Sequence, residues 1–396
     1  MLQYTKRGDD IMRFIITGDA HGNDVAFNEV IKNTINKYGN NIDAFIDLGD
    51  FTCDFLWGEE IYKTIKKLNE KGKFYGISGN RETGMVIPYY NKKKEGKKIG
   101  WNVDSSMGAP LLSCERMSDE TLNFISNLPE TLLIKFTKDK KENKNDKNTI
   151  YIETDLTPLP TPLFLKHKMP LTDEEIKLLK KENCTTILTA HTHILNNNKY
   201  DNYDIYNPGS IGLTGDGIPG ADYGELFFKN GKWNFISNHI DYNYDEIKRK
   251  LFENPVLFEK CQNWGTALLT AVEEGINVPA LYMFEKNRIV EELAKGTNKI
   301  ILDPKDNLTI STMGRYADID HQKNPLKENI IYANNNGLSI KGKEFNQEKP
   351  KNIDTSNIKV TNEIFDQALN NIIFYINEAK KNSTTEYEIK TGRLGK

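Results

Sequence analysis

The stretch FIITGDAHGN, Phe14–Asn23, changes abruptly from apolar and β-branched residues to Gly, Asp, His and Asn. The apolar half is typical of a buried strand, and the polar half begins where that strand ends. Asp19 and His21 suit a metal site, but Asp19 could equally cap the next helix and His21 could be an ordinary loop histidine. One Asp-x-His pair does not decide between these alternatives, so the other strand ends must.

Polar clusters also follow four further apolar strands, in the sequences AFIDLGDF, FYGISGNRE, LFLKHKMP and TILTAHTH. The side chains of interest in these clusters are Asp50, Asn80, Arg81, His167, His191 and His193. Strand ends of an α/β sheet share one rim, where ligands bind, so we expect the clusters to converge. Residues i and i+2 of an extended segment point the same way, which predicts that Asp19 pairs with His21 and His191 with His193.

Carboxylate, amide oxygen and imidazole are donors that suit Mn²⁺, Fe²⁺ or Zn²⁺, and the lack of thiolates argues against a structural zinc site. Seven such donors are too many for one tetrahedral ion and suit two ions that share a carboxylate. Two ions roughly 3.5–4 Å apart would suit an in-line displacement at phosphorus.

The order of these motifs resembles the calcineurin-like metallophosphoesterase superfamily: GDAH from Gly18, GD from Gly49, GN from Gly79, the strand-end His167, and AHTH from Ala190. TLNFISNLPETLLIKF and YNPGSIG further resemble its small bacterial and archaeal phosphodiesterase branch. The similarity covers roughly residues 12–240.

This resemblance implies a four-layer α/β/β/α sandwich of two mixed β-sheets flanked by helices. It also implies that one ion is bound by Asp19, His21 and His193, that the other is bound by Asn80, His167 and His191, and that Asp50 bridges them. A hydroxide held between the ions would attack phosphorus.

Two positions depart from the family's pattern. Arg81 stands where many relatives have a histidine that protonates the leaving group, and an arginine stays charged at neutral pH. We therefore expect Arg81 to clamp phosphate oxygens, and we expect activated esters and diesters to be better substrates than alkyl monoesters. Lys168 stands where close relatives often have glycine, which makes His167 the least secure ligand.

Residues outside the motifs have more ordinary explanations. Asp47 and Asp54 flank Asp50 and are expected to support or cap rather than to bind an ion. His239 and His321 fit no motif, and the GRYADIDH stretch from Gly314 is expected to be a solvated loop.

Strands and helices alternate through the first 240 residues, which predicts an α/β architecture. Helices are expected in DVAFNEVIKNTINKY from Asp24, after Ser118, and in the stretch from Thr172. Residues 81–108 read as a lid or insertion. We expect an N-terminal extension at 1–11, a catalytic domain at 12–242 and a mainly helical C-terminal region of unknown role at 243–396.

The chain has 396 residues and a net charge of −3, which supplies no global attraction to nucleic acid or anionic membranes. Its four cysteines are scattered and fit a reducing cytosol. The start of the chain lacks a signal-peptide core, and no run reaches the length of a membrane span. We therefore expect a soluble, cytoplasmic protein.

The sequence thus predicts a metal-dependent phosphoesterase that hydrolyses a phosphodiester or phosphomonoester, with Asp50 and Arg81 acting in catalysis. The cofactor is expected to be two divalent ions, with Mn²⁺ preferred and Fe, Zn or Ni as alternatives. Two other functions stay open: a non-catalytic metal-binding scaffold, and a nuclease recruited to nucleic acid by the C-terminal region. That region could also form a homo-oligomer through its helices.

Overall fold

The computed structural model describes residues 12–97, 108–137, 149–153, 161–165, 173–200, 203–215, 217–229, 232–296, 333–334, 337–338 and 354–382. These residues fall into two compact units. The first contains the described residues up to Arg249 except Gly108 and Gly215–Pro219, and the second contains those exceptions and the residues from Lys250 onward.

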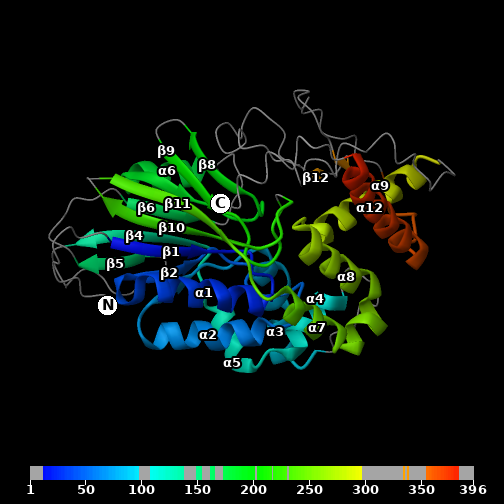
Figure 1. The fold of residues 1–396 in the computed structure, drawn as a ribbon, viewed down its shortest axis with the longest axis horizontal. Coiled ribbons are helices and arrows are strands. Elements are labelled where there is room, and N and C mark those ends of the chain that lie inside the picture. Colours follow the sequence, from blue (N-terminus) through cyan, green and yellow to red (C-terminus); the bar gives the residue numbers. More distant parts are fainter. Residues whose placement is uncertain are drawn as a thin grey trace. The chain divides into compact units, whose positions relative to one another are not determined.

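The first unit contains a mixed five-stranded sheet in the order β11-β10-β1-β2-β3 (Figure 1). Its strands are β1 (Met12–Thr17), β2 (Ala44–Asp47), β3 (Phe74–Gly76), β10 (Ala221–Lys229) and β11 (Lys232–Ile240). β1, β2 and β3 are parallel, whereas β10 pairs antiparallel with β1, and β11 pairs antiparallel with β10. Phe14 lies opposite Ala44 on one side and Leu226 on the other, which sets the register of the sheet centre.

The second sheet of this unit has six strands in the order β5-β4-β6-β7-β9-β8. They are β4 (Thr131–Thr137), β5 (Thr149–Glu153), β6 (Thr161–Leu165), β7 (Cys184–Leu188), β8 (Leu195–Tyr200) and β9 (Tyr203–Pro208). The apolar runs quoted in the sequence analysis predicted β1, β2, β3, β6 and β7, whereas β8 has the polar sequence LNNNKY and was not predicted.

The main core lies between the two sheets. Phe14 and Ile16 of β1 pack in one cluster with Ile134 of β4 and Leu188 of β7, and Trp233 of β11 belongs to the same cluster. Ile15 faces the opposite side of β1, because neighbouring strand residues alternate, and it is fully buried there as well. Both faces of the five-stranded sheet are therefore covered, which explains its near-continuous apolar strands.

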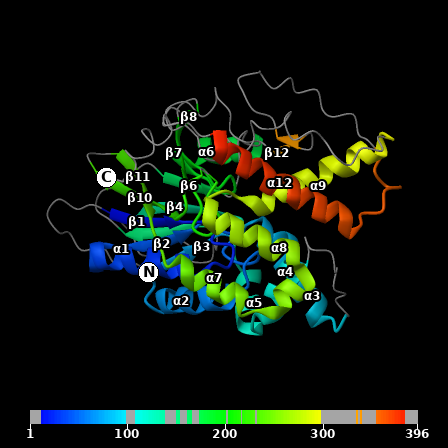
Figure 2. The same ribbon diagram turned by 45° about the vertical axis from the view of Figure 1, so that its right-hand side comes forward.

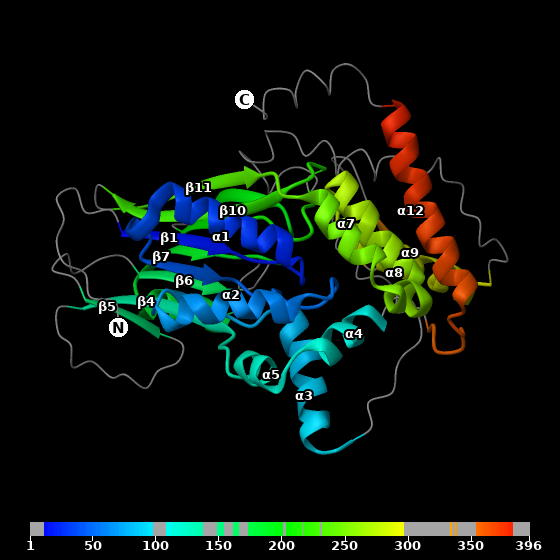
Figure 3. The ribbon, with the colours of Figure 1, turned by 60° about the horizontal axis from the view of Figure 1, so that its bottom comes forward.

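Helices form the outer layers. α1 (Asp24–Tyr38) and α2 (Gly58–Glu70) cover the five-stranded sheet, as Figure 3 shows. On the six-stranded sheet, α6 (Asp173–Lys181) places Leu179 against Cys184 and Ile187. The predicted four-layer α/β/β/α sandwich is confirmed by this packing.

Capping residues explain where the predicted helices begin and end. The Asn23 side chain accepts a hydrogen bond from the Ala26 N–H and so caps α1, which ends at Gly39. Ser118 caps α5 (Asp119–Ser126) through the Thr121 N–H. The other described helical segments before β4 are the 3₁₀ turn Gly39–Asn41, a π-helical turn η2 (Glu82–Val86), α3 (Ile87–Lys94) and α4 (Gly108–Arg116).

The residues of the C-terminal region that the structure describes are mainly helical, as predicted. α7 (Tyr244–Phe252) runs from the first unit into the second, which contains α8 (Pro255–Glu274), α9 (Val278–Ala294), the short strands β12 (Ala333–Asn334) and β13 (Gly337–Leu338), and α12 (Asn362–Asn382). α9 and α12 lie side by side (Figure 2), where Tyr282 contacts Phe365 and Asn371 donates to the buried Glu285. Across the described residues, the helices are all too short or too polar to cross a membrane.

Candidate metal centre

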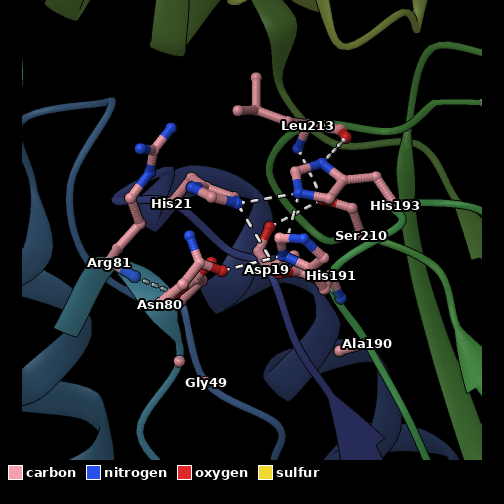
Figure 4. A network of polar contacts seen from close by, with 12 residues as sticks. Asp19, His21, Gly49, Asn80, Arg81, Ala190, His191, His193, Ser210 and Leu213 are labelled. Carbon is pink, nitrogen blue, oxygen red and sulfur yellow. Dashed lines mark hydrogen bonds and ion pairs between the residues drawn. The ribbon is translucent and has the colours of Figure 1, made fainter. Parts of the chain in front are cut away.

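The loops after β1, β2, β3 and β7 meet at one rim of the sandwich. β1, β2 and β3 are parallel, so their carboxyl ends lie at the same edge. These loops carry the predicted ligands Asp19, His21, Asp50, Asn80, His191 and His193. Figure 4 shows that the labelled ligand side chains from both sheets turn toward one another.

The backbone of these loops is left-handed rather than extended. The residues with φ between 50° and 75° include Asp19, His21, Asp50, His191 and His193. Such values are uncommon for residues other than glycine and concentrate at functional sites. The i, i+2 argument for an extended chain was therefore wrong in its geometry, although Asp19 and His21 do converge.

Backbone hydrogen bonds hold the β1 loop against the β2 loop. The N–H groups of Asp19, His21 and Gly22 donate to the carbonyl oxygens of Gly49, Asp50 and Phe51 at 3.0, 2.8 and 2.9 Å. The two loops are thus joined by a row of backbone hydrogen bonds that continues beyond the ends of the strands. A ligand on one loop is consequently positioned by the other.

Asp19, His21 and His193 form a buried group whose ligand atoms all lie within 4.8 Å of one another. Asp19 Oδ1 lies 3.7 Å from Nε2 of each histidine, and the two Nε2 atoms are 3.0 Å apart. One carboxylate oxygen and two imidazole nitrogens therefore face a common point (Figure 4).

The other ring nitrogen of each histidine has its own partner. His21 Nδ1 lies 2.5 Å from Asp54 Oδ2, and His193 Nδ1 lies 2.6 Å from the Leu213 carbonyl oxygen. Both partners are hydrogen-bond acceptors, so they favour a proton on Nδ1. In the neutral ring this leaves the Nε2 lone pair turned toward the common point, as in metal-binding histidines.

A second donor group lies beside the first. His191 Nδ1 is 2.9 Å from Asn80 Oδ1, and both side chains are exposed to solvent. The His191 N–H donates to Asp19 Oδ2 at 2.8 Å, which ties the two groups together. Asp50 Oδ1 accepts a hydrogen bond from the Arg81 N–H at 2.7 Å. His167 and Lys168 lie outside the described residues.

The Glu82 side chain holds the backbone around Asp50 in place through hydrogen bonds. Its fully buried carboxylate accepts hydrogen bonds from the N–H groups of Asp50 at 2.7 Å, Gly79 at 2.8 Å and Thr52 at 3.2 Å, and from the Thr52 hydroxyl at 2.8 Å. A Cβ atom at Gly79 would come within 2.1 Å of Asp50 Oδ1. The Gly79 position is therefore restricted to glycine.

The turn after β9 supports both Asp19 and His193. The buried Ser210 hydroxyl donates to the Asp19 carbonyl at 2.7 Å and accepts from the Leu213 N–H at 2.9 Å. The Leu213 carbonyl in turn accepts the hydrogen bond from His193 Nδ1. One hydroxyl thus links two ligands of the same group through backbone atoms.

The charges around His21 shift its protonation. Burial would lower the pKa of His21, but the carboxylates of Asp54 and Asp19 outweigh burial and raise it to about 9. Burial would likewise raise the pKa of Asp54, but the charges of Arg81 and His21 lower it to about 2. Asp54 is therefore ionised at neutral pH.

Several residues have the supporting roles that the sequence suggests, and others were missed. Asp47 accepts hydrogen bonds from the Gly49 N–H and the Thr17 hydroxyl, as a turn-capping residue would. His239 pairs with the buried Asp222 and is not a member of either donor group. The roles of Glu82 and Ser210 were not predicted, although both residues belong to motifs that the sequence analysis quotes. His321 and the GRYADIDH stretch lie outside the described residues.

The donor set fits a divalent cation. Asp19, His21 and His193 supply one oxygen and two nitrogens, which are the donors of Mn²⁺, Fe²⁺ and Zn²⁺ sites. The partners of the two Nδ1 atoms orient these rings in the way that metal sites require. Asn80 and His191 supply a second oxygen and nitrogen pair beside this group.

Three solved structures are similar to part of this chain. A metallophosphoesterase from Sphaerobacter thermophilus is 17% identical, with 67% of this chain and 100% of its own covered, at a TM-score of 0.44. A hypothetical protein from Pyrococcus horikoshii is 15% identical, with 67% of this chain and 98% of its own covered, at a TM-score of 0.46. An archaeal phosphodiesterase is 15% identical, with 57% of this chain and 100% of its own covered, at a TM-score of 0.30.

Sequence comparison is the stronger finding. The chain matches none of the curated proteins with which it was compared. Residues 12–195 match the calcineurin-like phosphoesterase family, and this range contains each of the strand-end ligands described above. Residues 12–195 of this chain thus belong to the calcineurin-like phosphoesterase family.

Proposed function

We propose that the chain is a phosphoesterase that uses two divalent metal ions, with Mn²⁺ as the preferred metal. The observation that supports this most is the pair of neighbouring donor groups at the rim, one of Asp19, His21 and His193 and one of Asn80 and His191. The family match supports phosphoester chemistry, and the oxygen and nitrogen donors suit the metal.

Each predicted ligand has a task in this proposal. Asp19, His21 and His193 would hold one ion, and Asn80 and His191, with His167, would hold the other. Asp50 would lie between the ions, kept in place by the Arg81 N–H on its carboxylate and by Glu82 on its backbone N–H. When bound, the ions would supply Lewis-acid charge and an activated water. The protein would supply orientation.

We propose phosphodiesters and other esters with good leaving groups as the substrate class. A guanidinium stays charged at neutral pH, so Arg81 cannot donate a proton to a leaving group. Its Nε–H group is also bound to Asp54 at 2.9 Å. Leaving groups that depart without a protein-supplied proton would therefore be favoured. A cytoplasmic location and self-association through the C-terminal helices stay predictions.

The test is hydrolysis of bis-p-nitrophenyl phosphate and p-nitrophenyl phosphate with and without Mn²⁺. We expect Mn²⁺-dependent turnover, a higher kcat/KM for the diester, and loss of activity in Asp50→Asn. Asp119→Asn is the matched control, since this carboxylate is 71% exposed and pairs only with a surface lysine among the contacts described. No metal-dependent turnover of either ester would favour the scaffold function. Unchanged activity of Asp50→Asn would refute its bridging role.

A further inference from the structure

Two charged residues outside the donor group, Arg81 and Asp54, are linked to its member His21 by polar contacts. Arg81 Nε donates to Asp54 Oδ2 at 2.9 Å, and the same oxygen lies 2.5 Å from His21 Nδ1. The Asp54 side chain is fully buried, and that of Arg81 is 29% exposed. These contacts thus run from a partly exposed guanidinium, through a buried carboxylate, to a ligand histidine.

The Asp54 loop is built around the His21 backbone. The Phe55 N–H donates to the His21 carbonyl at 2.8 Å, and the Trp57 N–H donates to the Gly22 carbonyl at 3.3 Å. A Cβ atom at Gly22 would lie 2.5 Å from the Phe55 carbonyl oxygen, so the two loops are in direct contact there. Asp54 itself has a φ of 68°, an uncommon value that this packing maintains.

Arg81 is directed toward this carboxylate rather than toward the common point of the ligands. In Figure 4 the guanidinium lies beyond His21, on the side away from His193. The Arg81 N–H is bound to Asp50 Oδ1, so the backbone of the same residue is tied to the predicted bridging ligand. Arg81 therefore contacts Asp50 directly and is linked to His21 through Asp54.

We propose that Arg81 and Asp54 are positioning residues of the metal centre: Arg81 fixes the Asp54 carboxylate, and Asp54 holds the His21 ring with Nε2 turned toward Asp19 and His193. The proposal rests on the metal centre of the proposed function and assigns Arg81 a role that needs no contact with substrate. It replaces the phosphate clamp with a structural link to His21.

The physical argument concerns ring orientation. A carboxylate on Nδ1 fixes both the tautomer and the angle of a ligand histidine, and loss of such a partner typically weakens metal binding 10–100-fold. The Asp54 carboxylate needs its own donor, because a buried charge with one partner removed is strongly disfavoured. Arginine suits this task better than lysine, since its planar group stays charged and holds a fixed direction.

The test is calorimetric titration of the metal-free full chain with Mn²⁺ alone. We expect Asp54→Asn and Arg81→Met each to weaken Mn²⁺ binding about 10–100-fold. The double variant should be no weaker than the worse single variant, because both act through His21. Arg249→Met is the control for loss of an arginine, since that side chain is 52% exposed and pairs with Glu246 on the surface of α7.

Further readouts separate this role from a general loss of folding and from a substrate clamp. Thermal unfolding of the metal-free Arg81→Met and Arg81→Lys variants shows whether folding is kept, and Arg81→Lys should restore part of the affinity. A positioning role predicts that inorganic phosphate binds the Mn²⁺-saturated variants as it binds the original chain. Unchanged Mn²⁺ affinity with weakened phosphate binding would overturn the proposal in favour of the clamp. Failure of the original chain to bind Mn²⁺ would instead overturn the metal centre, and with it both proposals.

Discussion

Replacement of Glu82 by glutamine tests whether the carboxylate under Asp50 organises the rim. Glu82 is fully buried and receives four hydrogen bonds, two on each oxygen. Glutamine has almost the same shape but offers only one acceptor oxygen and turns an NH₂ group toward the other pair of donors. The substitution therefore changes hydrogen bonding with little change in volume.

The magnitude follows from the better of the two amide orientations. With its oxygen facing the Asp50 and Gly79 N–H groups, the amide leaves the Thr52 N–H without an acceptor, while the Thr52 hydroxyl can rotate to accept instead. One unsatisfied buried donor costs about 1–3 kcal/mol. The two retained bonds also lose their charge-assisted strength, which adds about 1 kcal/mol. We expect Glu82→Gln to lower the free energy of unfolding by about 2–4 kcal/mol.

Urea unfolding followed by circular dichroism measures this change, with the slope m compared between variants. Glu29→Gln is the control, because Glu29 is a half-exposed partner of Lys32 on α1 and should change stability by less than about 0.5 kcal/mol. Mn²⁺ titration of Glu82→Gln should also show weakened binding, since the retained hydrogen bond to the Asp50 N–H loses its charge-assisted strength. A loss of stability below about 1 kcal/mol would refute the assigned role of Glu82.

Other perturbations of the rim have similarly defined outcomes. Ser210→Ala removes the hydroxyl between Asp19 and Leu213 and should cost about 1–3 kcal/mol by urea unfolding, whereas Ser126→Ala, which removes a helix-internal hydroxyl, should cost less. The metal-free protein should lose up to roughly 3 kcal/mol of its free energy of unfolding as the pH rises from 6.5 through 9. The reason is that the protonated His21 ring, whose pKa is raised to about 9, stabilises the fold, and the neutral ring does not. A stability that does not change with pH in that window would contradict this prediction. Mn²⁺ affinity should rise over the same window, because the ion displaces that proton. Saturation with Mn²⁺ at a hundred times its Kd should raise the free energy of unfolding by about 2.7 kcal/mol at neutral pH, and excess chelator should reverse the gain.

The apolar runs were enough to predict the sandwich because most strands are covered on both faces. Ile15 and Ile16 are both fully buried although they face opposite layers, so the strand appears in the sequence as an uninterrupted apolar run. β8 was missed for the converse reason. It is an edge strand with a polar sequence, and it is recognised only by its pairing with β9, which no local pattern encodes.

The residue types of the site were predictable, but the backbone that presents them was not. Glycines stand beside Asp19, His21 and Asp50, yet the left-handed φ values belong to the Asp and His residues as well. No side-chain pattern encodes such a conformation, because it is imposed by tertiary hydrogen bonds such as that from His21 N–H to the Asp50 carbonyl. The same limit applies to Asp54, whose contact with Arg81 depends on where two loops meet.

The arrangement of these contacts bears on how a bound ion would act on the fold. Asp19 and His21 come from the five-stranded sheet and His193 from the six-stranded sheet, so an ion at this group would cross-link the two layers of the sandwich. Strained φ values cost about 1–3 kcal/mol each, and the buried bonds to Glu82 and Ser210 are what offset that cost in the polypeptide itself. An ion would add stabilisation at the point where both sheets meet. Its effect should therefore reach amide protons in β1 and in β7 alike, rather than the rim loops alone.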